Sequence, residues 1–174
     1  MARDNSPVTN AEHLPEGYSM RPFRPGEEED WCRCCADGEL GVAEISAAEF
    51  DRKMTSDDKV ESRNIYFLVS PEEEIAGTVT YRHGASAKEG CVHMVGIVKS
   101  HRGKGLAAPM VNWAVREIIA GGNETICLST DDWRLPAIKA YLNCGFEPCV
   151  SDEDTARRWE EVRLRLETGN RESS

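Results

Sequence analysis

The stretch KSHRGKGLAAP, residues 99–109, separates an apolar run from a run with helical periodicity. It gathers Lys99, His101, Arg102 and Lys104 in a chain of 174 residues whose formal net charge is -10. A turn that contains glycine and leads from a strand into a helix leaves backbone N–H groups unpaired, and the helix dipole favours an anion there. The stretch therefore predicts a site for a di- or polyphosphate, with a solvated basic turn as the alternative.

The residues on either side indicate a strand followed by a helix. CVHMVGIV, residues 91–98, is an apolar strand that ends at the basic stretch. Downstream, apolar residues recur at three- and four-residue spacing from Leu106 to Ile119, which predicts a helix with one buried face. Pro109 would remove an internal hydrogen bond about one turn into this helix. The helix is therefore expected to start later or to bend there.

The other elements complete a mixed α/β sheet. Strands are predicted at residues 17–24, 64–70, 75–83 and 124–130, and the alternating VRLRL from Val162 is typical of a terminal strand. Helices are predicted within residues 25–37, 47–54 and 136–145. The order is a run of antiparallel strands and then strand, helix, strand, helix, strand, so we expect a mixed sheet with helices packed on it.

Length and charge limit the organisation and the partners. We expect one domain at residues 17–166, with a flexible N-terminal extension at 1–16 and a flexible tail at 167–174. Acidic residues outnumber basic ones by 31 to 21, which argues against nucleic acid and membrane surfaces as partners. The start of the chain has no apolar core of a signal peptide, so we expect a cytoplasmic protein.

The cysteines suggest reduced thiols. There are seven, an odd number, and a cytoplasmic protein keeps its thiols reduced. Cys32, Cys34 and Cys35 form CRCC, which could bind a soft metal, but no second pair of ligands follows at zinc-site spacing. We favour the alternative, in which these cysteines are small apolar residues of a partly buried helix. No metal is expected.

Two motifs resemble those of the GNAT superfamily of N-acetyltransferases. Arg102, Gly105 and Ala107 fit the pattern Gln/Arg-x-x-Gly-x-Gly/Ala, which holds the coenzyme A pyrophosphate in that family, whereas the P-loop and dinucleotide-binding patterns are absent. RLPAIKAYLNCGF, residues 134–146, is similar to the family's second motif, a helix that ends in Tyr and is followed by Gly-Phe. The resemblance implies a mostly antiparallel sheet of about six or seven strands, splayed at the cofactor site and flanked by about four helices.

The resemblance also implies roles for individual residues. The strand segment from Val95 to Ile97 would pair with the pantetheine and acetyl groups, and the loop from Arg102 to Ala107 would hold the pyrophosphate. Tyr141 would be the general acid that protonates the departing thiolate, although a core aromatic is the alternative. Gly103 and Gly105 have no Cβ, so a phosphate can approach their backbone closely. The cofactor-binding residues expected in this way are Val95, Gly96, Ile97, Arg102, Gly103, Lys104, Gly105, Leu106, Ala107, Arg134 and Tyr141.

The general base is not given by the family pattern, because residues 91–98 contain no Asp or Glu. His93 is the best titratable substitute on this strand, and a structural histidine is the alternative. Glu89, Asp131 and Asp132 stay open as other bases. Two further departures concern the cofactor. Arg134 stands where the family often has Asn, and Lys99 replaces a usual Pro.

These features predict acetyl transfer from acetyl-CoA to a primary amine by direct attack in a ternary complex, without a covalent enzyme intermediate. The acceptor amine is not indicated, and the resemblance leaves a homodimer open, since members of the family commonly dimerise. A non-catalytic sensor that binds acyl-CoA is a second hypothesis, supported by the missing carboxylate on the strand. A protein that meets a partner through the basic loop is a third, and it predicts no binding of coenzyme A.

Overall fold

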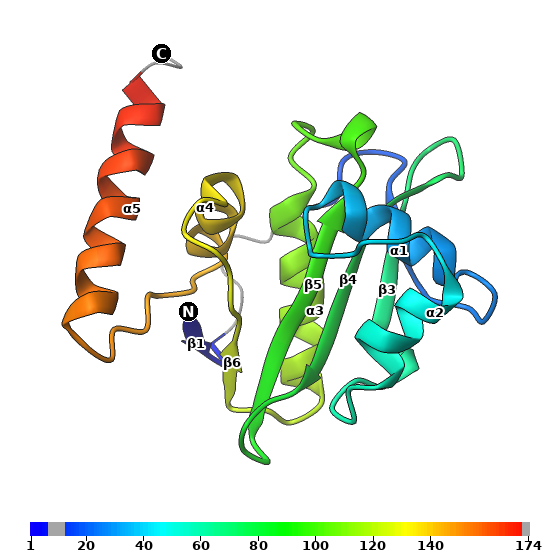
Figure 1. Ribbon diagram of the computed structural model, residues 1–174, viewed down its shortest axis with the longest axis horizontal. Coiled ribbons are helices and arrows are strands. Elements are labelled where there is room, and N and C mark those ends of the chain that lie inside the picture. Colours follow the sequence, from blue (N-terminus) through cyan, green and yellow to red (C-terminus); the bar gives the residue numbers. More distant parts are fainter. Residues whose placement is uncertain (7–12, 172–174) are drawn as a thin grey trace.

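Six strands form a single mixed sheet in the part of the chain that the structure describes, residues 1–6 and 13–171 of a computed structural model (Figure 1). Their order is β1-β6-β5-β4-β3-β2, and every neighbouring pair is antiparallel except β5 and β6. This confirms the predicted mixed sheet. The strands are β1 Ala2–Asp4, β2 Ser19–Pro22, β3 Ile65–Val69, β4 Ile75–His83, β5 Glu89–Ile97 and β6 Thr125–Cys127.

Five α-helices accompany the sheet in the same described residues, one more than expected. They are α1 Glu28–Asp37, α2 Ala47–Phe50, α3 Ala107–Ala120, α4 Leu135–Asn143 and α5 Glu153–Arg171. A π-helical turn, Asp51–Thr55, continues α2, and 3-10 turns lie at Ser62–Asn64 and Lys99–His101. None of the described helices combines the length and the apolar character that a bilayer span requires.

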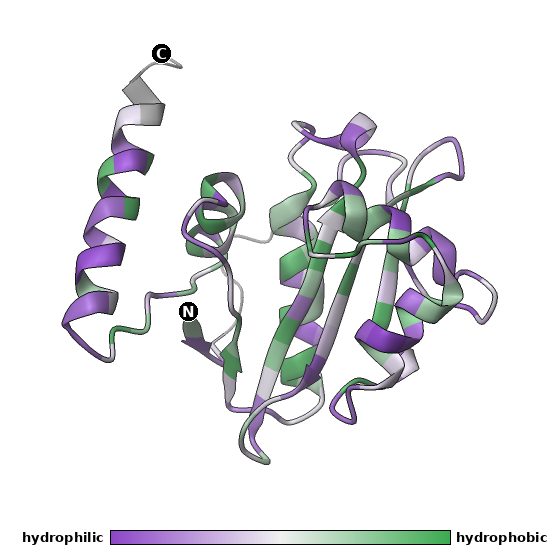
Figure 2. Ribbon diagram, in the orientation of Figure 1, coloured by the Kyte–Doolittle hydropathy of each residue, from purple (hydrophilic) through white to green (hydrophobic). Residues whose placement is uncertain are grey.

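Helices lie on both faces of the sheet (Figure 1), and an apolar core lies between the helices and the sheet on each face. Helix α3 packs on one face, where Met110, Val111 and Ile118 are fully buried against β4 and β5. Helices α1 and α2 cover the other face around Trp31 and Phe67. Figure 2 shows hydrophobic residues along β5 and on α3, whereas α5 is mostly hydrophilic. The buried faces of α1 and α3 follow the helical spacing of their apolar residues.

The cysteines of α1 lie in the second of these cores. Cys32, Cys34 and Cys35 are buried, as expected for small apolar residues. Burial raises the pKa of each of the three thiols, and for Cys34 the pKa rises to about 12. Their thiols are therefore protonated at neutral pH and contribute to apolar packing.

The helix α3 starts earlier than its sequence indicated. It begins at Ala107, so Pro109 is its third residue. The N–H groups of the first turn have no acceptor within the helix, and a proline there loses no hydrogen bond. The expected late start or bend is therefore wrong.

Both ends of the chain contribute structure that the sequence did not indicate. Residues 1–16 were expected to be a flexible extension, yet β1 pairs with β6 and Ala2 also bridges to Glu147. The strand can join because β6 offers a free edge to it. Part of the extension, residues 7–12, lies outside the described residues. The expected tail, 167–174, overlaps the end of α5, and residues 172–174 lie outside the described residues as well.

The predicted terminal strand from Val162 is a helix instead. Trp159, Val162 and Leu166 recur at helical spacing and are the more buried residues of this part of α5, whereas Leu164 is 53% exposed. Arg157 forms ion pairs with Asp154 and Glu161, three and four residues away. Pairs at this spacing stabilise a helix. The alternation in VRLRL was therefore misleading.

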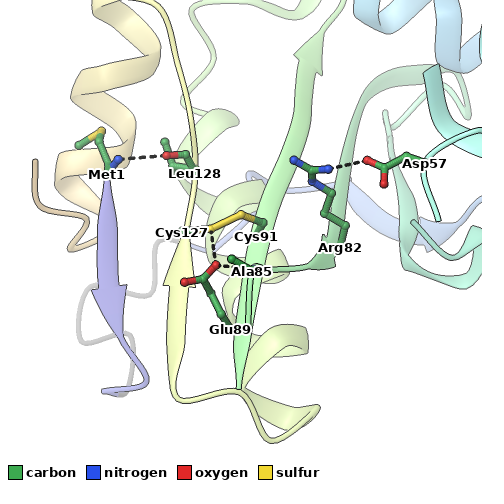
Figure 3. Close-up of a disulfide and its surroundings, with 8 residues drawn as sticks. All are labelled: Met1, Asp57, Arg82, Ala85, Glu89, Cys91, Cys127 and Leu128. Carbon is green, nitrogen blue, oxygen red and sulfur yellow. Dashed lines mark hydrogen bonds and ion pairs between the residues drawn. A yellow bond between two sulfur atoms is a disulfide. The ribbon is translucent and has the colours of Figure 1, made fainter. Parts of the chain in front are cut away.

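A disulfide joins Cys91 to Cys127, with the two Cα atoms 4.6 Å apart (Figure 3). The expectation that all thiols are reduced is therefore wrong for this pair, while the other five cysteines take part in no disulfide within the described residues. The parallel pairing of β5 with β6 places the two residues directly opposite each other. Within the described residues, Glu89 with these two cysteines is the one cluster of possible metal ligands, and the disulfide removes both thiolates from it.

Candidate active site

The strands β5 and β6 separate just beyond the disulfide. They pair only over Glu89–Cys91 and Thr125–Cys127, while β5 continues to Ile97 with no partner on that side among the described strands. A bulge also interrupts its pairing with β4, and Met94 there has a positive φ of 50°. Backbone groups of β5 near Val95 are thus available to a ligand on the open side. The predicted splay of the strands is present.

Two cavities of about 530 Å³ each lie at this opening. The first, which we call the loop cavity, is bounded by the end of α1, by β5, by the basic loop and by α4. Its residues are Gly38, Glu39, Val95, Ile97, His101, Arg102, Gly103, Gly105, Leu106, Ala107, Ala108, Trp133, Arg134, Pro136, Ala137, Lys139, Ala140, Tyr141 and Asn143.

The second, the wedge cavity, lies between the separating strands. It is lined by residues 39–41, 91–95 and 128–131 together with Arg82, Arg134 and Tyr141. Four residues line both cavities: Glu39, Val95, Arg134 and Tyr141. A molecule in one cavity can therefore meet a molecule in the other at these four residues.

The basic loop has the features of an anion site. Gly103 and Gly105 have positive φ angles of 75° and 72°, a conformation that strongly favours glycine. The loop delivers the chain into α3, whose first turn has no side-chain cap. Its N–H groups and the positive end of the helix dipole consequently face the loop cavity. Arg102 extends along the loop, and its Nε donates to the carbonyl oxygen of Ile97 at 3.1 Å.

The structure accounts for the two unusual cations. The backbone N–H of Lys99 donates to the Asp37 carboxylate at 3.0 Å, a bond that proline could not make. Arg134 donates through Nη2 to the carbonyl oxygen of Gly38 at 3.1 Å. Since it starts α4 and lines both cavities, Arg134 ties α4 to the end of α1 across the opening.

Two of the predicted cofactor residues do not line either cavity. The Nζ of Lys104 lies 3.3 Å from the Tyr18 hydroxyl and faces the buried His101. Gly96 faces α1, because a Cβ built on it would lie 2.6 Å from the carbonyl oxygen of Cys34. The loop cavity brings the other nine together.

Tyr141 stands where the two cavities meet. It is 5% exposed and packs edge-on against Phe146. Burial raises the pKa of Tyr141, and the charge of Arg134 offsets this only in part. Its hydroxyl makes no hydrogen bond to the described part of the chain, so a protonated phenol is available to a ligand. The core alternative and the general-acid role are both compatible with this position.

His93 lines the wedge cavity but not the loop cavity. Burial lowers the pKa of His93 to about 4, and the charge of Arg82 adds to this effect. Arg82 lies on β4, directly opposite Cys91 of β5. It forms an ion pair with Asp57, as Figure 3 shows. His93 is thus a neutral imidazole at physiological pH and can accept a proton only from an acidic donor.

The lowered pKa of His93 predicts a pH-dependent stability. The pKa of His93 in the folded protein, about 4, lies below the ordinary value of 6.5. The contribution of His93 to the free energy of unfolding is therefore complete above pH 6.5 and is lost as the pH falls toward 4. We expect the free energy of unfolding of the wild type, relative to His93→Gln, to fall by roughly 2 kcal/mol between pH 7 and pH 4.5. Urea unfolding of both proteins across this range measures it, and parallel curves would contradict it.

Several lining residues were not foreseen from the sequence. Trp133 is 52% exposed beside the loop cavity, and its neighbour Arg134 lies over its ring at 5.9 Å. Lys139 adds a further cation to the same cavity. Glu39 and Arg82 come from segments without a motif. Lys139 follows Pro136 by three residues, so helical spacing would have placed these two on one face of the helix, but no sequence signal pointed to Glu39.

Comparison with known proteins identifies a family match. A model described as the acetyltransferase (GNAT) family matches residues 23–146. The chain is 27% identical over 146 residues to a mycothiol acetyltransferase of Pseudarthrobacter chlorophenolicus, covering 76% of this chain and 43% of that protein. This chain therefore spans less than half the length of that relative.

Solved structures show the same fold. A GCN5-related N-acetyltransferase from Sphaerobacter thermophilus aligns with a TM-score of 0.64 at 20% identity, covering 84% of this chain and 46% of the other. The NatC complex bound to Gag peptide and CoA aligns with a TM-score of 0.59 at 17% identity, covering 76% of this chain and 86% of the other. At these identities the likeness concerns the fold alone.

Proposed function

This chain belongs to the GNAT family of acetyltransferases, and from that premise we propose that it transfers an acetyl group from acetyl-CoA to a primary amine. The observation that carries the proposal is the pair of cavities that meet at Tyr141. One is suited to an anionic cofactor and the other opens beside the bare edge of β5. Two substrates can be held together there, as direct attack requires.

Acetyl-CoA is proposed to occupy the loop cavity. Its pyrophosphate would lie on the loop from Arg102 to Ala107 and on the first turn of α3, where backbone N–H groups and the helix dipole favour it. Lys139 and Arg134 add positive charge to the walls. The exposed ring of Trp133 offers a surface for the adenine. The pantetheine arm would then follow β5 past Ile97 to Val95.

The acceptor amine is proposed to occupy the wedge cavity. Its nitrogen attacks the thioester carbonyl carbon, the C–N bond forms, and the C–S bond breaks as the tetrahedral intermediate collapses. Backbone N–H groups at the bulge near Val95 would stabilise the oxyanion. Tyr141 would donate its proton to the thiolate. His93 would accept a proton from the attacking nitrogen only after bond formation has made that nitrogen acidic.

The proposed class of acceptor rests on the composition of the chain. The acidic composition favours cationic amines such as polyamines, aminoglycosides or basic peptide termini as acceptors. The relative from Pseudarthrobacter is named for mycothiol, and that name concerns the relative. A cytoplasmic location, a mechanism without a metal and a homodimer stay proposals.

The first test is a calorimetric titration with acetyl-CoA beside ATP. We expect saturable binding of acetyl-CoA with a Kd in the micromolar range and at least tenfold weaker binding of ATP, because only acetyl-CoA has an arm that reaches β5. An amine panel with detection of released thiol then measures transfer. If a folded protein binds neither ligand, the proposal fails and the basic loop serves another partner.

A second candidate function is a sensor that binds acyl-CoA without turnover. The observation that favours it is the absence of a carboxylate on β5 beyond Glu89. A sensor would bind acetyl-CoA in the titration and release no thiol with any amine. Replacement of Tyr141 distinguishes the two functions further.

A further inference from the structure

Glu39 is placed where the two cavities meet, together with Val95, Arg134 and Tyr141. It is the second residue after α1, next to the C-cap residue Gly38, and it is exposed. Its carboxylate has no hydrogen bond or ion pair within the described residues. Glu39 is thus the one acidic residue, among those described, that borders both the proposed cofactor and the proposed acceptor.

The backbone of Glu39 is in a conformation that glycine would adopt more easily. Its φ is 57°, in the left-handed region. The N–H of Glu39 donates to the carbonyl oxygen of Ala36, and that of Leu40 to that of Cys35, at 3.1 and 3.0 Å. These two bonds form a Schellman motif, in which the residue at this position is usually glycine. The backbone conformation at this position is therefore less favourable for glutamate than for glycine.

We infer that Glu39 holds the ammonium group of the acceptor and takes its first proton. This rests on the function proposed above. An ammonium must lose one proton before its nitrogen can attack and a second after the C–N bond has formed. A carboxylate attracts the ammonium group by its charge, whereas a neutral imidazole does not. Glu39 accepts the first proton and passes it to solvent, to which it is exposed, and His93 accepts the second.

The position of Arg134 supports this assignment. Its Nη2 donates to the carbonyl oxygen of Gly38, and this hydrogen bond joins the end of α1 to the start of α4. The residue after Gly38 is thereby held at the edge of the wedge cavity. Asp131, the other acidic residue that lines the wedge cavity, is absent from the loop cavity. Glu39 is therefore the better placed of the two for a nitrogen that must reach the thioester.

Replacement of Glu39 tests the inference with opposite effects on activity and stability. We expect Glu39→Gln to lower kcat/KM about 30-fold for the best amine of the polyamine, aminoglycoside and peptide panel, with the Kd for acetyl-CoA unchanged. Glu39→Asp should recover part of the loss. Glu39→Gly should lose activity like Glu39→Gln and raise the Tm by about 3 °C, because glycine relieves the backbone.

Glu73 provides the matched control. It is also exposed, has a positive φ of 64°, and lies in the turn between β3 and β4 away from both cavities. Glu73→Gly should raise the Tm similarly and leave kcat/KM as in the wild type. A Glu39→Gln protein with wild-type kcat/KM would overturn the inference while the proposed function stands. A wild type that binds acetyl-CoA and acetylates no amine would overturn both.

Discussion

Replacing Tyr141 by phenylalanine is expected to lower kcat about 10²- to 10³-fold and to leave the Kd for acetyl-CoA within about twofold. The phenyl ring keeps its place in the core beside Phe146, so packing is preserved. Only the hydroxyl at the meeting point of the cavities is lost. The departing thiolate then has no proton donor. Thiol release measures kcat, and calorimetry measures the Kd.

Tyr81 is the matched control for this change. It lies on β4 and stacks on Tyr66, outside both cavities. Tyr81→Phe removes one hydroxyl as well and should retain wild-type kcat. Full turnover by Tyr141→Phe would remove Tyr141 from the mechanism and leave it as a core aromatic. Binding of acetyl-CoA by the wild type without any turnover would favour the sensor.

Replacing Gly96 by alanine is expected to lower the free energy of unfolding by about 3 kcal/mol. A Cβ at this position would lie 2.6 Å from the carbonyl oxygen of Cys34 and 3.0 Å from its carbonyl carbon. These are backbone atoms of α1, which cannot rotate away as a side chain could. Helix α1 would have to move off β5, and Glu39 would move with it. Urea unfolding measures the change in stability.

Gly121 is a suitable control because it also lies at the end of an element. Its φ is -73° and the nearest atoms to an added Cβ are 3.4 Å away. Gly121→Ala should change the free energy of unfolding by less than about 1 kcal/mol. Equal stability of Gly96→Ala and Gly121→Ala would contradict the close contact between α1 and β5 at Gly96.

The elements around the basic loop could be predicted because their patterns are local. The strand that precedes the loop is an apolar run, and the helix that follows the loop shows a period of three to four residues, from which its buried face follows. The loop itself was recognisable by its glycines and charges. Of the predicted site residues, nine line the loop cavity for this reason.

The remaining features depend on contacts between distant segments. Cys91 and Cys127 meet only because β5 and β6 pair in parallel, and a count of cysteines does not contain that register. Glu39 is brought to the cavities by the end of α1, which has no motif. The segment from Val162 shows both an alternating and a helical spacing, and the ion pairs of α5 favour the helix.

The disulfide also gives the molecule an unusual connectivity. Between Cys91 and Cys127 the chain contains the part of β5 that lines the two cavities, the basic loop and all of α3. The sulfur–sulfur bond closes these elements into a covalent ring. If trypsin cuts at the exposed Arg102 or Lys104, the two fragments consequently stay linked, and they migrate as one chain until a reductant is added.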